Sequence, residues 1–255
     1  MIEPLNLNPY HLELVDYKIV KFGENLPLHS SSMFEYLIGS NGIFVRAVRP
    51  GLEVIIPVEL FTASIRGLEP IEPLVRLTPG RIPQQILIQM WKESCIAALA
   101  EPPLEIAFHI HHFQEKWQLV IPKQTQSSEK CRAIEYGLDS SYINATVEVH
   151  SHNRIAAFFS GADNADEGGF RIFAVLGKVT ESSAEIICRV GVYRQFWHVP
   201  ADWIFELPSF IADVTNNGEK DDSIFQFYSS SVAPSLLDDP LKLPTTFGGL
   251  PDVQL

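Results

Sequence analysis

The sequence lacks the features that mark membrane-spanning, exported and disulfide-stabilised proteins. No apolar run approaches the roughly 20 residues that a membrane-spanning helix needs, and the first residues include neither the basic nor the apolar region of a signal peptide. The three cysteines, Cys95, Cys131 and Cys188, are too few and too far apart for a disulfide framework or a cysteine-rich zinc site. We therefore expect a cytoplasmic protein with reduced thiols and no membrane partner.

Positive charge is also scarce. The 255 residues include 19 Lys and Arg against 31 Asp and Glu, a formal net charge of -12, and the basic residues form no cluster. Nucleic acid is therefore not an expected partner, whereas an acidic surface suits basic protein partners. Hydrophobic residues make up 46% of the chain, which is enough to bury one substantial core and a small second one.

The most informative stretch contains two histidines separated by one residue. Residues 147–149 alternate as a β-strand does, so His150 and His152 should project from the same face of that strand. Asp163 falls in the first turn of a short acidic helix predicted over residues 161–167. Two imidazoles and one carboxylate leave the fourth tetrahedral position of a zinc ion open for water. The spacing therefore predicts a catalytic site with one Zn²⁺ per chain.

Structural interpretations of these residues stay open. Ser160 followed three residues later by Asp163 is also a helix N-terminal capping pattern. His109 and His111 form a second pair with the same spacing, but no carboxylate follows at a comparable distance, and a polar turn comes directly after. We interpret this second pair as structural, with His109 as a candidate lining residue of the zinc site.

The spaced residues His-Ser-His, then Ser160 and Asp163, resemble the JAMM motif of the JAB/MPN metalloprotease family. In that family the two histidines and the aspartate hold zinc, the serine stabilises the oxyanion, and an upstream glutamate is the general base. The resemblance implies these roles for His150, His152, Asp163 and Ser160. Bacterial-type JAB proteins look most similar, since the chain shows no long insertion of the kind that eukaryotic deubiquitinases use.

Glu105 takes the position of the family's glutamate, because it begins an apolar strand that follows a predicted helix over residues 84–100 and two prolines. Glu148 is a second candidate base on the strand of the histidines. It lies roughly 7 Å along the strand from His150, so we favour a supporting role for it. The chain departs from the family at Asn153, where many members have proline.

We expect an α/β (α+β) fold in three parts. Residues 1–80 form a small N-terminal β-rich unit, with its clearest strands at 35–38, 43–48 and 52–58. The resemblance covers residues 81–207 and implies a JAB/MPN domain, a mixed β-sheet flanked by helices that is similar to the cytidine deaminases. A helix over residues 84–100, the strands 117–122, 170–176 and 184–193, and a loop-like segment over 123–139 are predicted within it. Residues 208–255 are polar and proline-containing, and we predict a loop-like tail.

The resemblance implies a zinc-dependent metallopeptidase or isopeptidase that hydrolyses amide bonds in a protein or peptide, with the C-terminal tail of a ubiquitin-like protein as the suggested substrate. The alternative from another class is a non-catalytic MPN-type scaffold that binds protein partners. A zinc deaminase is disfavoured, because the HxE and PCxxC motifs of those enzymes do not occur. The sequence leaves the oligomeric state open.

Overall fold

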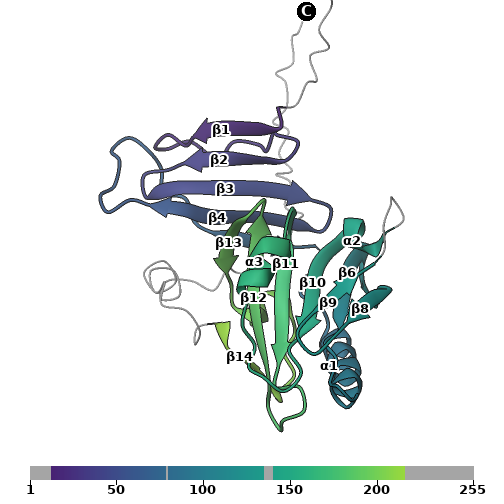
Figure 1. Cartoon of the computed structure of the whole chain (residues 1–255). Coiled ribbons are helices and arrows are strands. Elements are labelled where there is room, and N and C mark those ends of the chain that lie inside the picture. Colours follow the sequence, from purple (N-terminus) through teal and green to yellow (C-terminus); the bar gives the residue numbers. More distant parts are fainter. Residues whose placement is uncertain (1–12, 79, 135–139, 216–255) are drawn as a thin grey trace, which may run out of the picture. The chain divides into compact units, whose positions relative to one another are not determined.

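The computed structural model describes residues 13–78, 80–134 and 140–215, which form a mixed α+β structure made mostly of strands (Figure 1). Two principal sheets account for most of these strands, one with five strands and one with seven. The predicted boundary at residues 80 and 81 falls between the last strand of the first sheet and the helix that precedes the second.

The N-terminal sheet has its strands in sequence order, with β1 parallel to β2 and every other pair antiparallel. Its strands are β1 (Val15–Ile19), β2 (Phe34–Ile38), β3 (Gly42–Arg49), β4 (Leu52–Leu60) and β5 (Leu74–Leu77). Buried apolar side chains, among them Leu37, Phe44 and Ile55, form a core against this sheet. The three strands predicted here are confirmed within two residues at each end.

The seven-stranded sheet is mixed, because β10 runs parallel to β11 and antiparallel to β6. In spatial order its strands are β13 (Gln195–His198), β12 (Ala184–Val192), β11 (Phe170–Gly177), β10 (Ala145–Ser151), β6 (Ala107–Phe113) and β7 (Lys116–Val120), with β14 (Ile211–Asp213) also paired with β12. Every residue of β11 is buried, as expected for a central strand with both faces covered. Strand β10, which contains His150 and ends just before His152, therefore lies near the middle of the sheet.

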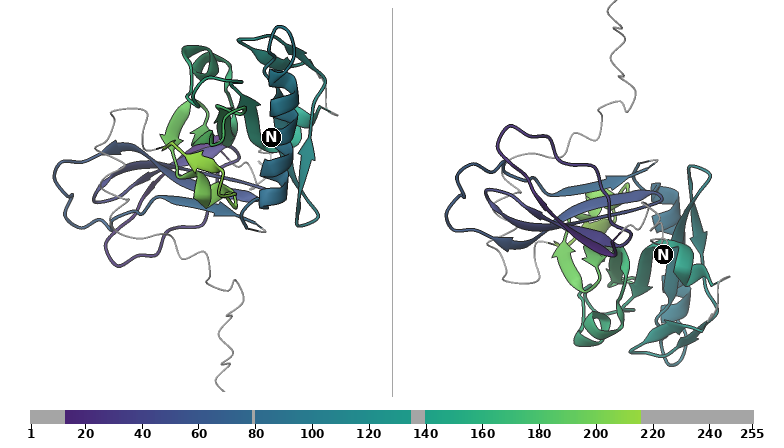
Figure 2. Two further views of the ribbon diagram at one scale, coloured as in Figure 1. Left: turned by 90° about the horizontal axis from the view of Figure 1, so that it is seen from below. Right: turned by 90° about the horizontal axis from the view of Figure 1, so that it is seen from above.

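Helices contribute less than predicted. Among the described residues α1 (Gln84–Ala98) is the one long helix, and α2 (Ser141–Asn144), α3 (Gly161–Asp166) and α4 (Ala201–Ile204) each span less than two turns. Helix α1 lies beside the seven-stranded sheet (Figure 2), where Trp91 Nε1 donates to the carbonyl of Val179 at 2.9 Å. A sheet flanked by several helices is thus only partly what the chain forms.

The segment predicted to be loop-like over residues 123–139 contains a small antiparallel hairpin, so that prediction was wrong for its first part. Strands β8 (Gln124–Gln126) and β9 (Cys131–Ala133) pair with each other and form a sheet of their own. All three residues of β8 are polar and each strand is only three residues long, so the alternation that reveals longer strands is missing. Residues 135–139 and most of the predicted tail, from residue 216 onward, lie outside the described residues. In the described start of that tail β14 pairs with β12, so the loop-like prediction was wrong for these three residues.

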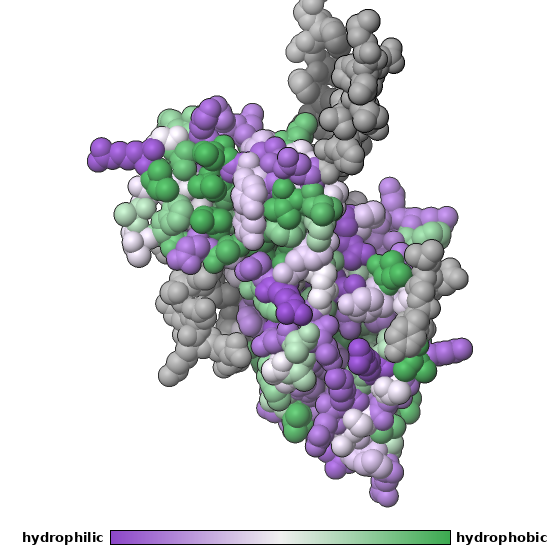
Figure 3. Space-filling view, turned by 45° about the horizontal axis from the view of Figure 1, so that its top comes forward, coloured by the Kyte–Doolittle hydropathy of each residue, from purple (hydrophilic) through white to green (hydrophobic). Residues whose placement is uncertain are grey.

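Several large apolar side chains are exposed on and around the N-terminal sheet, where Figure 3 shows apolar residues gathered. They include Tyr17, Ile19, Phe22 and Leu28. Within the described part of the chain, no helix combines the length and the apolar character that crossing a membrane requires.

Candidate metal centre

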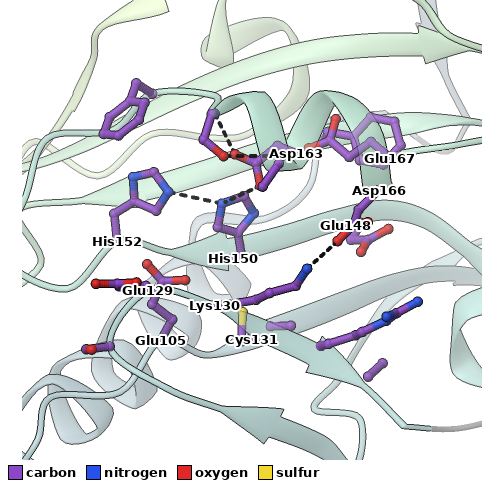
Figure 4. Close-up of a pocket in the computed structure, with 18 of the residues that line it drawn as sticks. Glu105, Glu129, Lys130, Cys131, Glu148, His150, His152, Asp163, Asp166 and Glu167 are labelled. Atoms are coloured by element: carbon purple, nitrogen blue, oxygen red, sulfur yellow. Dashed lines mark hydrogen bonds and ion pairs between the residues drawn. The ribbon is translucent and has the colours of Figure 1, made fainter.

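Three side chains converge where β10 ends and α3 begins (Figure 4). His150 is the penultimate residue of β10, His152 directly follows the strand, and Asp163 lies in the first turn of α3. The two Nε2 atoms of the histidines are 3.3 Å apart, and His150 Nε2 is 3.5 Å from Asp163 Oδ1. One possible ligand atom from each residue lies within 4.8 Å of the others. The structure therefore brings the three predicted metal ligands together.

These separations fit a tetrahedral zinc site. Two imidazole nitrogens about 2.0–2.1 Å from the same tetrahedral zinc ion lie about 3.3–3.4 Å from each other. The observed separation between the histidine nitrogens is 3.3 Å, and the distance from His150 to the carboxylate of Asp163 is only slightly longer. Two neutral imidazoles and one carboxylate are also a donor set that zinc accepts. The residues present thus fit the metal that the sequence pattern predicts.

The backbone around His152 fixes the direction of its ring. Its Nδ1 lies 3.2 Å from the carbonyl oxygen of Ala156, a bond in which Nδ1 donates and which leaves the Nε2 lone pair for a metal. Asn153 follows with a φ of 50°, a left-handed conformation that asparagine tolerates and proline cannot adopt. The asparagine that departs from the family pattern therefore matches the local backbone.

Burial lowers the pKa of both histidines, for His150 to about 4, because a charged imidazole is poorly solvated there. For His150 the negative charge of Asp163 opposes this shift without cancelling it. Both rings are therefore neutral near pH 7, which is the form that binds a metal.

Asp163 takes part in a helix cap and also faces the histidines, so it fits both interpretations that the sequence left open, capping residue and metal ligand. Its Oδ2 accepts a hydrogen bond from the backbone N–H of Ser160 at 2.6 Å, while Ser160 Oγ accepts one from the N–H of Asp163 at 3.2 Å. This reciprocal pair is a capping box, and it begins α3. The other carboxylate oxygen, Oδ1, points to His150. The structural cap therefore orients the carboxylate toward the histidines.

Glu105 lies on the opposite side of the same pocket from Asp163 (Figure 4). The antiparallel register of β6 and β10 sets Ala107 opposite His150, so extending it by two residues sets Glu105 opposite His152. Glu105 precedes the first residue of β6, which begins at Ala107 rather than at Glu105 as predicted. Sheet pairing thus brings together residues that are far apart in the sequence.

The Glu105 side chain is buried, with 5% of the residue exposed. Burial raises its pKa to about 7, with further contributions from the negative charges of Asp163 and Glu129. A carboxyl group with this pKa exchanges protons readily near neutral pH, as a general base and acid must.

The pocket encloses a cavity of about 600 Å³ between the start of β6, β10, α3 and the β8–β9 hairpin. Glu148 also lines it and lies 3.4 Å from Arg171 through Oε2 and Nη1. This arginine neighbour supports the structural role expected for Glu148. Ser160 lines the same cavity.

The second histidine pair is held elsewhere. His109 Nδ1 lies 2.7 Å from Ser141 Oγ, and His111 Nε2 lies 2.7 Å from the carbonyl oxygen of Ser141. His109 is fully buried and does not line the pocket, so its predicted lining role was wrong. In the described part of the chain, His150, His152 and Asp163 form the one cluster with the geometry of a metal site.

Sequence reasoning missed the wall of the pocket that the β8–β9 hairpin forms. Residues 128–133 all line it, and Lys130 Nζ forms an ion pair with Asp166 Oδ2 of α3 at 2.7 Å. Cys131 also lines the pocket, and burial strongly raises the pKa of its thiol, so it is not a thiolate nucleophile. The polar turn over residues 127–130, between the two short strands, was the one sequence feature that could have indicated a hairpin here.

Comparisons of the chain with known proteins give no family assignment. No protein-family model matches it, and no curated protein sequence matches it significantly.

Proposed function

We propose that this protein is a zinc-dependent metallopeptidase that hydrolyses amide bonds. One observation carries the proposal: two histidines and an aspartate at zinc-ligand separations share a pocket with a buried glutamate whose pKa is about 7. A donor set with an open coordination position beside a proton-transferring group is the arrangement of a hydrolytic zinc site. In the proposed site His150, His152 and Asp163 hold the metal.

When bound, zinc would supply a Lewis acid that activates a water molecule and polarises the amide carbonyl. Glu105 then takes a proton from the attacking water and delivers it to the leaving amine nitrogen. General acid–base participation of this kind typically contributes about 10² to 10⁴ in rate.

In the proposed mechanism Ser160 stabilises the oxyanion that develops on the carbonyl oxygen. Its Oγ accepts a hydrogen bond from the backbone N–H of Asp163, which uses an oxygen lone pair and leaves the hydroxyl proton to donate. Because the same residue caps α3, its position is fixed before substrate binds.

The substrate we propose is a protein or peptide with an extended tail, and the resemblance to the JAB/MPN family suggests the C-terminal tail of a ubiquitin-like protein. The family resemblance, together with a cavity open to the metal ligands and to Glu105, supports this choice. The alternative, a non-catalytic scaffold, predicts partner binding without turnover.

The test measures zinc content by mass spectrometry for wild type, His152→Ala and Glu105→Ala. The same three proteins are assayed for cleavage of a ubiquitin-like protein with a C-terminal peptide extension, and of an unstructured peptide mixture. We expect one zinc per chain in wild type and Glu105→Ala and little in His152→Ala, because His152 is one of the three proposed ligands and Glu105 is not. Cleavage should occur in wild type alone.

Two results would contradict the proposal. Zinc bound by none of the three proteins under metal-replete conditions would refute the metal site. Zinc bound by wild type without cleavage of either substrate would refute the hydrolase and favour the scaffold.

A further inference from the structure

The short segment that contains Glu105 is bordered on one side by side chains rather than by a strand. Strand β7 pairs with β6 only from His109 onward, so its ladder does not reach Ala107. There the carboxamide of Gln124 takes the place of a neighbouring strand. Its Oε1 accepts from the N–H of Ala107 at 2.7 Å, and its Nε2 donates to the carbonyl of Ala107 at 3.1 Å.

Glu105 is held in the same way. Gln126 Nε2 donates to the carbonyl of Glu105 at 2.7 Å, and the N–H of Glu105 donates to the carbonyl of Ser127 at 2.8 Å. Gln124 and Gln126 are two residues apart on β8, so both project from the same side of that strand. The β8–β9 hairpin thus contacts the Glu105 segment through two amide side chains and one backbone bond.

The other edge of the segment is tied to the metal ligands. Ile106 donates to Ser151 Oγ at 3.1 Å and accepts from the N–H of Ser151 at 3.0 Å, and Ser151 lies between the two histidines. Every backbone N–H and C=O of residues 105–107 therefore has a partner. Three of these six groups depend on the two glutamines.

We propose that Gln124 and Gln126 are positioning residues for Glu105, which hold the general base at its distance from the metal ligands. This inference rests on the proposed function. Without their carboxamides the carbonyls of Glu105 and Ala107 lose their partners on this edge, and one backbone bond, from the N–H of Glu105 to the carbonyl of Ser127, remains there. A displacement of about 1 Å of a catalytic group can cost about 10²-fold in rate.

The first measurement is amide hydrogen exchange on the metal-free protein, which does not depend on activity. Gln124→Ala and Gln126→Ala are compared with wild type and with Gln118→Ala, an exposed glutamine of β7 that serves as the matched control. We expect the N–H groups of Glu105 and Ala107 to exchange faster in the two β8 variants. Exchange at Val147 and Val149 in β10 should stay unchanged, which shows that the sheet is intact.

The second measurement is steady-state hydrolysis by the zinc-loaded proteins. We expect Gln126→Ala to bind zinc fully and to lose about 10- to 100-fold in kcat with little change in KM, because the metal site and the substrate contacts remain. Gln126→Glu keeps the size of the side chain, but an ionised carboxylate cannot donate a hydrogen bond to the carbonyl of Glu105. This variant should therefore lose as much in kcat as Gln126→Ala. Gln118→Ala should match wild type.

A double-mutant cycle separates positioning from general damage. If Gln126 acts through Glu105, then Gln126→Ala should cause no further loss of residual activity in a Glu105→Ala background. An equal loss in both backgrounds, or unchanged exchange at Glu105 and Ala107, would overturn the inference. Failure of wild type to hydrolyse any substrate would overturn the proposed function instead, and the exchange data would still decide whether the glutamines hold the segment.

Discussion

Replacing Glu105 with glutamine should stabilise the metal-free protein at alkaline pH and have little effect at acidic pH. The carboxyl group is buried beside Asp163 and Glu129, and its pKa is raised from the ordinary value of 4.5 to about 7. The folded protein therefore holds a proton on Glu105 over a pH range in which the unfolded chain has released it. Glutamine has nearly the same shape and no charge to bury.

The sign follows from proton linkage. Between pH 4.5 and about pH 7 the folded state binds more protons at Glu105 than the unfolded state, so this residue lowers the free energy of unfolding as the pH rises. Above pH 7 the ionised Glu105 lowers the free energy of unfolding by its full amount. A difference of about 2.5 pKa units at about 1.36 kcal/mol per unit corresponds to about 3 kcal/mol.

The assay is urea denaturation of chelator-treated wild type and Glu105→Gln at pH 5 and pH 8. We expect the variant to gain about 1 kcal/mol or less at pH 5 and about 3 kcal/mol at pH 8. Glu59→Gln, at an exposed position of β4, is the control and should show no comparable pH dependence. Zinc is removed because its positive charge would favour the ionised carboxylate.

An equal difference between Glu105→Gln and wild type at both pH values would refute the conclusion that burial of this carboxylate is costly. Destabilisation by glutamine at pH 8 would refute it more strongly. Activity should change in the opposite direction, since Glu105→Gln gains stability but loses the carboxylate that we propose as the general base.

Two further predictions concern the packing that supports the site. Gly177→Ala should destabilise the protein by about 2 kcal/mol or more, because the added Cβ would lie 2.1 Å from the backbone nitrogen of Ala157. The control is Gly161→Ala, where nothing lies within 4 Å of the added Cβ. Urea denaturation measures the stability of both variants. Leu87→Ala in α1 should cost about 2–5 kcal/mol because this side chain is fully buried, whereas Ile96→Ala, at a residue that is 65% exposed in the same helix, should change the midpoint little.

The regular elements were predictable wherever a pattern extended over several residues. The apolar stripe of α1 repeats at helical spacing, and the alternating or continuously apolar strands β3, β4, β11 and β12 are each eight or nine residues long. The β8–β9 hairpin was missed because its strands are three residues each and mostly polar. Strand β14 is also only three residues long and depends on pairing with β12.

In the candidate site, too, local patterns predicted some residues, whereas others depend on contacts between distant segments. His150 and His152 share a face because of local strand geometry, and the capping box that orients Asp163 requires only residues 160–163. Glu105 was selected through family resemblance, because no local pattern connects it with residues 45 positions later. His109 illustrates the reverse case, since a local pattern placed it near the site and the tertiary structure buries it against Ser141.

The sequence by itself determined the acidic composition, the longer strands, the long helix α1 and the spacing of the candidate metal ligands. The strands, the helix and the spacing each depend on neighbours within a few residues. Only the tertiary structure decided that the pairing of β6 with β10 brings Glu105 into the pocket of the two histidines, that burial raises its pKa, and that two glutamines of a short hairpin contact the backbone of its segment. These features arise from contacts between distant segments, and neither their geometry nor their solvent exposure is encoded in any local pattern.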